Sequence, residues 1–272
     1  MLHMFCGAGL IKNNYKNMNT KIMLNKVPEI TLYFWIIKIF CTTVGETGAD
    51  FLNTNLNLGL NGTTIVMSVL LTITLIFQFK SEKYKPSIYW LAVVLLSVVG
   101  TLITDNLINN FGISLQTTSI LFSVILALVF VVWYKVGKTL SIHSIHTTKR
   151  EAFYWLAILF TFALGTATGD LIAETFSVGY LLSAFLFGGL IAVTYAGYKY
   201  FNLDVVFAFW VAYILTRPLG ASIGDYLSQD KSAGGLELGT VVTSGIFLTT
   251  ILATVIYLII TKKDITNVKE LN

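Results

Sequence analysis

The stretch Phe34–Asp50, FWIIKIFCTTVGETGAD, begins as an apolar segment and ends as a polar one. Its first half is fit for lipid, yet the stretch carries Lys38, Glu46 and Asp50. A charged side chain costs about 2.5–3.5 kcal/mol or more at the bilayer centre, so it normally faces the protein interior or an aqueous cavity. The stretch therefore predicts a membrane-spanning helix with one polar face turned away from lipid.

The composition of the whole chain is that of a membrane protein. Of its 272 residues, 55% are hydrophobic and only 12% are charged, and the mean hydropathy is +0.75. A soluble domain carries about twice that charged fraction. The net charge of +4 is small. Cys6 and Cys41 are too few for a disulfide framework or a zinc site.

The opening stretch is the first of four copies of one pattern, an aromatic residue followed by Trp-x9-Gly-x4-Asp. Successive tryptophans are separated by 55, 65 and 55 residues, which indicates a two-repeat unit that is itself duplicated. The tryptophans are Trp35, Trp90, Trp155 and Trp210, the glycines Gly45, Gly100, Gly165 and Gly220, and the aspartates Asp50, Asp105, Asp170 and Asp225.

Each repeat contains two apolar segments of membrane-spanning length. The sequence therefore predicts an all-α integral membrane protein with eight transmembrane helices, formed by four parallel two-helix repeats in two pseudo-symmetric halves. An alternative is that the pattern-bearing segments are short and re-entrant, broken near the aspartate by the glycines and by Pro218. The pattern-bearing spans are expected at about 30–52, 87–108, 152–174 and 204–227, and the plainer spans at about 63–79, 117–134, 179–198 and 239–261.

The basic residues predict the orientation. Of the 18 lysines and arginines, 15 lie in the two ends and in alternate connections, and only Lys231 lies in the opposite connections. By the positive-inside rule both termini are expected in the cytoplasm. The expected divisions are a leader at 1–26, in which Met23 is an alternative start, a first half at 27–134, a connector at 135–150, a second half at 151–261 and a tail at 262–272.

Each aspartate lies fifteen residues beyond its tryptophan, about 22 Å further along a helix. Because each repeat has an even number of spans, all four repeats cross in the same sense, and the four carboxylates should converge on the outer half of the bundle. Our first choice for a cation or proton site is Asp50, because Glu46 stands one turn before it on the same helix face. The other candidate ligands are Thr43, Thr47, Asp105, Thr101, Thr104, Asp170 and Asp225.

The remaining pattern residues have structural interpretations. The tryptophans are expected to be interfacial anchors or repeat-packing residues, and the glycines close-packing positions rather than unwound segments. Single aspartates can also serve as polar fasteners between helices. Lys38 and Arg217 are too far along their own helices to pair with the local aspartate, so we expect them to balance the charge of the acidic residues between helices.

The fourfold tryptophan-containing repeat resembles a family of bacterial membrane-anchored proteins built from tandem repeats of unknown function. The residues that carry this resemblance are KVPEITLYFWIIKIFCTTVGETGADFL at the head of the first repeat and TRPLGASIGDYLS in the last, and it extends over about 27–262. It implies a multi-pass protein of the bacterial inner membrane and supplies no catalytic residues.

Two main functions remain open from the residues alone, and a carrier for an uncharged metabolite is a third. The first is a transporter or channel-like protein for a cation, with oxygen ligands that suit hard ions such as magnesium or manganese, or protons. The second is a non-transporting scaffold or assembly factor whose charges fasten the repeats together. No enzymatic motif, cofactor or nucleic-acid partner is predicted. The lipid bilayer is the expected environment, and the sequence leaves the identity of a bound metal and the oligomeric state open.

Overall fold

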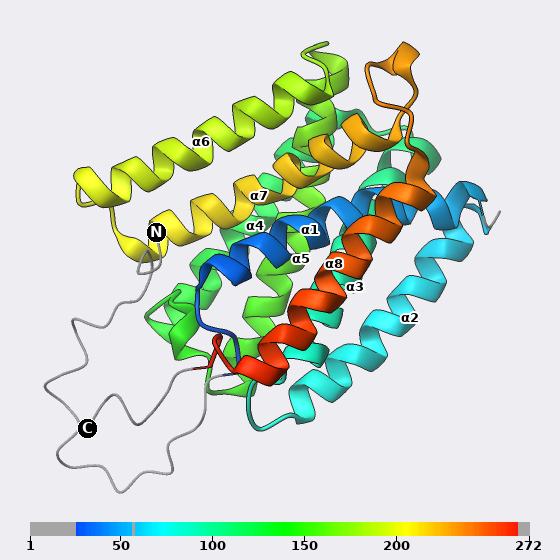
Figure 1. Ribbon diagram of the computed structural model, residues 1–272. Helices are drawn as coiled ribbons and strands as arrows, with labels where there is room; N and C mark the ends of the chain where they lie inside the picture. Colours follow the sequence, from blue (N-terminus) through cyan, green and yellow to red (C-terminus); the bar gives the residue numbers. More distant parts are fainter. Residues whose placement is uncertain (1–25, 56–57, 266–272) are drawn as a thin grey trace, which may run out of the picture.

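The computed structural model describes residues 26–55 and 58–265, and this part of the chain is helical without a strand (Figure 1). The expected leader at 1–26 lies almost wholly outside the described residues, as does most of the tail. The long helices are α1 (Leu32–Asp50), α2 (Gly59–Lys80), α3 (Pro86–Asp105), α4 (Leu115–Gly137), α5 (Thr148–Asp170), α6 (Tyr180–Tyr200), α7 (Val205–Ser228) and α8 (Gly239–Thr261).

The starts of the pattern-bearing helices follow from local sequence. The side chains of Thr31, Thr147 and Asp204 each accept a hydrogen bond from a backbone N–H in the first turn of α1, α5 and α7. Such caps satisfy an N–H group that has no partner within the helix. α3 instead begins with Pro86, which needs no N–H partner and has a backbone angle suited to a first helical turn.

Seven of the helices in the described residues, α2 to α8, are long and apolar enough to cross a membrane. The eighth long helix, α1, has 19 residues and differs by carrying Lys38, Glu46 and Asp50. The other pattern-bearing helices, α3, α5 and α7, are also continuous. Pro218 lies inside α7 without ending it. The helices therefore suit a multi-pass membrane protein, and the pattern-bearing segments are full-length helices rather than short ones.

The four pattern-bearing helices form a closed inner ring. α1 packs on α3, α3 on α5, α5 on α7, and α7 packs back on α1. The second helix of each repeat covers the first helix of the next: α2 lies on α3, α4 on α5, α6 on α7, and α8 on α1. Figure 1 shows α6 beside α7 at one edge of the bundle and α2 at the opposite edge. Large apolar side chains on the outer helices are exposed, as a lipid-facing surface requires.

The aromatic residue and the tryptophan of each repeat form one layer of contacts around the inner ring. The first aromatic residue of each repeat packs against the tryptophan of the next repeat, and the fourth returns to the first. Trp90, Trp155 and Trp210 are buried, so their role is packing between repeats rather than anchoring at the lipid interface. The ring-centroid distances are 5.6 Å for Phe34–Trp90, 5.4 Å for Tyr89–Trp155, 6.3 Å for Tyr154–Trp210 and 5.8 Å for Phe209–Trp35.

The pattern glycines close the ring in a second layer. Each one faces the residue three positions before the glycine of the next helix. A methyl group on Gly100 would lie 2.7 Å from the Phe162 Cβ and 3.1 Å from the Ala163 backbone nitrogen, so no side chain fits there. The four glycines therefore lie at positions where neighbouring inner helices approach closely. The pairs are Gly45 with Ser97, Gly100 with Phe162, Gly165 with Arg217, and Gly220 with Thr42.

Candidate cation site

The four pattern aspartates lie at or near the ends of the inner helices. Asp50, Asp105 and Asp170 are the last residues of α1, α3 and α5, and each is followed by a five-residue π-helix. α7 has no such segment and continues as an α-helix to Ser228. Short π-helical turns are rare and frequently mark functional sites. The end of the ring that carries the aspartates is therefore the part of the fold where a site is best placed.

Three carboxylates from three helices meet at this end. One oxygen each from Glu46 on α1, Asp170 on α5 and Asp225 on α7 lies within 4.8 Å of the other two. Glu46 and Asp225 are buried, and Asp170 is half-buried. An all-oxygen set of this kind suits a hard cation. We call Glu46, Asp170 and Asp225 the carboxylate cluster.

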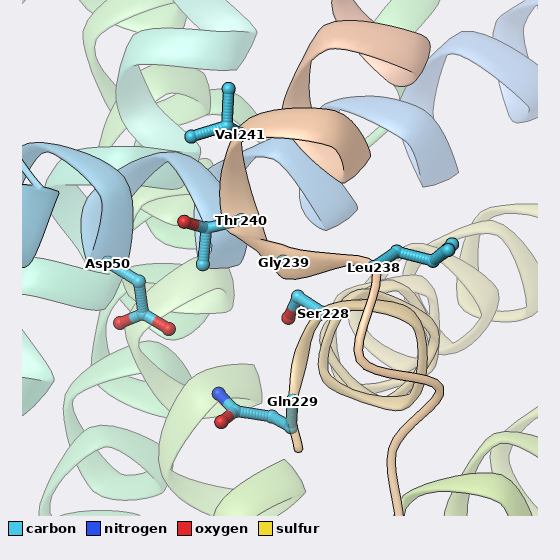
Figure 2. Close-up of a pocket in the computed structure, with 7 residues that line it drawn as sticks. All are labelled: Asp50, Ser228, Gln229, Leu238, Gly239, Thr240 and Val241. Carbon is cyan, nitrogen blue, oxygen red and sulfur yellow. The ribbon is translucent and has the colours of Figure 1, made fainter. Parts of the chain in front are cut away.

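Asp50 and Asp105 lie outside the carboxylate cluster, although Asp50 with Glu46 was our first choice from the sequence. Asp50 instead lines an open pocket of about 580 Å³ between the ends of α1 and α7 and the start of α8. Figure 2 shows its carboxylate and the Gln229 amide reaching into the same opening. The pocket is lined by Asp50, Ser228, Gln229, Leu238, Gly239, Thr240 and Val241.

Arg217 lies directly beside the carboxylate cluster and is fully buried. Its Nη2 lies 2.7 Å from Glu46 Oε2, 2.5 Å from Thr101 Oγ1 and 2.7 Å from Thr166 Oγ1, so its two N–H groups are shared among three acceptor oxygens. These contacts join α7 to α1, α3 and α5. Arg217 thus pairs with an acid on another helix, and Gly165 provides the space through which its side chain passes.

Lys38 has a different environment from Arg217. Its Nζ lies 4.2 Å from the ring centroids of Phe162 and Tyr213, and it donates a hydrogen bond to Thr216 Oγ1 at 3.3 Å. Within residues 26–55 and 58–265 it forms no ion pair with a carboxylate. Attraction between a cation and aromatic faces stabilises its position. The structure thus places only one of the two expected charge-balancing residues against an acid.

Most of the threonines expected as ligands bond elsewhere. Thr43 donates to the Ile39 carbonyl, and Thr47 bonds the Thr43 carbonyl and the Ser244 hydroxyl. Thr104 donates to the Gly100 and Ala163 carbonyls. A threonine hydroxyl in a helix commonly satisfies itself in this way. Of the four candidates, Thr101 alone is seen to contact a charged side chain near the cluster.

Thr166 is a site residue that sequence reasoning missed. It follows Gly165 directly, as Thr101 follows Gly100 and Glu46 follows Gly45. These three positions are equivalent in their repeats, and their side chains all contact Arg217 Nη2. The signal was therefore present in the sequence, at the position after the pattern glycine in the first three repeats.

Together these features define a tandem-repeat membrane protein with a buried acidic cluster and a paired arginine inside a ring of four helices. The sequence model of the Repeat of Unknown Function (DUF347) matches the chain four times, at residues 33–84, 88–139, 153–202 and 208–264. The protein belongs to this family. No curated protein and no solved structure matches the chain.

Proposed function

We propose that the protein moves a hard cation across the membrane, as a carrier or channel-like protein, and that the carboxylate cluster binds this cation. The observation that supports the proposal most strongly is the convergence of Glu46, Asp170 and Asp225 within 4.8 Å. At that distance two carboxylates repel by about 3–4 kcal/mol at an effective dielectric constant of 20. One arginine offsets part of this repulsion, and a bound cation or proton offsets the rest.

The surroundings of the carboxylate cluster support access from one side. The open pocket lined by Asp50 lies at the same end of the ring as the cluster. At the other end the aromatic layer fills the space between the inner helices with buried rings. A cation would then reach the cluster through the pocket, and passage to the other side would require the aromatic layer to move.

The alternative is a non-transporting scaffold, and one observation favours it: the bonds of Arg217 link all four inner helices. This explains Arg217 and Glu46 without a ligand. It leaves the approach of Asp170 and Asp225 to Glu46 unexplained, because a structural fastener needs only one acid. Cation binding that depends on Asp170 and Asp225 would therefore distinguish a cation transporter from a non-transporting scaffold. Neither function assigns a reaction to the chain.

Replacing Asp225 with asparagine is expected to weaken cation binding at least about tenfold, or ~1.4 kcal/mol, because the change removes a charge from the cluster and keeps its shape. Mn²⁺ is a suitable hard-ion probe, and its binding to the purified protein is measured by calorimetry. The matched control is Glu237→Gln, since Glu237 is exposed in the loop that follows α7 and pairs loosely with Lys231 at 3.7 Å. The proposal does not survive if the wild-type protein shows no saturable Mn²⁺ binding, or if Asp225→Asn binds as the wild type does.

We also propose that the protein lies in the bacterial inner membrane with both termini in the cytoplasm, so that the pocket opens to the outside. The distribution of lysine and arginine supports this orientation. A reporter inserted after Gly137 is expected to read cytoplasmic, and one inserted after Gly112 external. The reverse pattern of reporter activity would invert the proposed direction of access.

A further inference from the structure

The hydrogen bonds of Arg217 have the form of a coordination site. Three oxygens from three helices, Glu46 Oε2, Thr101 Oγ1 and Thr166 Oγ1, lie 2.5–2.7 Å from one nitrogen atom, Nη2. An arginine that serves only to pair with a carboxylate commonly uses two nitrogens in parallel. Here the two N–H groups of a single nitrogen serve three oxygens, which surround that nitrogen as ligands surround a small cation.

The other two nitrogens of the guanidinium group differ from Nη2. Nε and Nη1 of Arg217 are buried and have no hydrogen-bond partner among the residues that the structure describes. A buried donor without a partner is destabilising, and more so when the group is charged. Among these residues the guanidinium group is thus held by hydrogen bonds at one nitrogen only, which lowers the cost of moving it out of the site.

The repeat pattern explains why an arginine sits among these oxygens. The position after the pattern glycine carries an oxygen in the first three repeats, as Glu46, Thr101 and Thr166, but is Ala221 in the fourth. The fourth helix supplies Arg217 instead, one turn earlier. Three repeats therefore provide ligands at this layer, and the fourth provides a positively charged side chain that fills it.

We propose that Glu46, Thr101 and Thr166 form a site for a singly charged cation, and that Arg217 occupies this site until a free cation displaces it. The charge follows from the ligands, since Glu46 is the only ionisable side chain of the three. The inference rests on the proposed function and extends it. It adds a second site, on the side of the carboxylate cluster that faces the cytoplasm in the proposed orientation, and gives the charge of the ion that this second site binds.

Glu46 connects the two sites. It belongs to the carboxylate cluster and also accepts the hydrogen bond from Arg217. A cation in the cluster therefore competes with Arg217 for the same carboxylate. Occupation of the cluster weakens the hold of Glu46 on Arg217.

The test removes the guanidinium group of Arg217 by mutation and adds free guanidinium ion to the solution. Arg217→Ala is expected to unfold at a lower temperature than the wild type, and millimolar guanidinium is expected to recover at least half of the loss in a saturable manner. Tetramethylammonium at equal concentration is the control, because it has the same charge but no N–H group and is too large for the site. Sodium and potassium are tested in parallel: stabilisation by either extends the site to metal ions, and stabilisation by guanidinium alone restricts it to nitrogen cations.

Two further substitutions test whether the added cation binds at the proposed site. Thr101→Val and Thr166→Val in the Arg217→Ala background are expected to abolish the saturable stabilisation. If Arg217→Ala folds only in guanidinium, it is purified with that ion, and removal of the ion should lower the unfolding temperature. The proposal is overturned if none of the three cations stabilises Arg217→Ala, or if the valine substitutions leave the stabilisation unchanged. This outcome is distinct from failure of the proposed function, which is measured by Mn²⁺ binding to the wild-type protein and depends on Asp225.

Discussion

Replacing Arg217 with methionine is expected to lower the free energy of unfolding by about 3–5 kcal/mol, because the change leaves the buried carboxylate of Glu46 without its counter-charge. Methionine is flexible and fills much of the same space, so the loss reports the charge more than a cavity. The side chains of Arg217 and Glu46 are 0% and 9% exposed, so water cannot replace the lost partner easily. Thr101 and Thr166 also lose their shared donor.

Unfolding of the purified protein in detergent measures this effect, and a double mutant identifies its cause. Arg217→Met with Glu46→Gln is expected to be more stable than Arg217→Met alone, since the double change removes both charges. Lys231→Met is the matched control. Its partner is Glu237 at 3.7 Å in an exposed loop, where ion pairs contribute about 0–1 kcal/mol. Equal stability of Arg217→Met and Lys231→Met would contradict the buried pairing.

The helical repeat and its packing positions could be predicted from the sequence. The recurrence of tryptophan, glycine and aspartate at fixed spacing identified the four inner helices, and the glycines indicated close contact between them. A glycine contact depends mainly on the backbone path, which the repeat fixes. For this reason close packing at Gly100 could be predicted, although its partner Phe162 could not.

The membership of the carboxylate cluster could not be predicted in the same way. Helix spacing placed Glu46 and Asp50 on one face, but Glu46 lies one turn before the end of α1, where it meets Asp170 and Asp225, and Asp50 at the end of α1 lines the pocket. The shift of each helix along its axis relative to its neighbours is set by packing, which the sequence of a single helix does not specify.

The two buried cations show the same limit. Lys38 lies seven residues before its pattern glycine and Arg217 only three before its own. This difference of about one helical turn places Lys38 among the aromatic rings and Arg217 at the cluster. The sequence assigned both residues one role, because it gives their charge but not which side chains surround them. Counting the residues between each basic residue and the glycine of its repeat would have distinguished the two environments.

Transport is expected to be lost when the carboxylate cluster is neutralised at Asp170. Asp170→Asn keeps the size of the side chain at the end of α5 and removes one of three charges that converge there. If the cluster binds the transported cation, this loss slows movement of the ion even where the protein folds normally. Glu237→Gln, in the exposed loop, is expected to transport as the wild type does.

The most direct test of cation movement through the carboxylate cluster is Mn²⁺ flux into liposomes that contain the purified protein and an enclosed fluorescent indicator. The wild type and Glu237→Gln are expected to admit Mn²⁺ faster than protein-free liposomes, and Asp170→Asn to match the protein-free rate. Wild-type flux equal to that of protein-free liposomes, or undiminished flux in Asp170→Asn, would contradict a transport role for the carboxylate cluster.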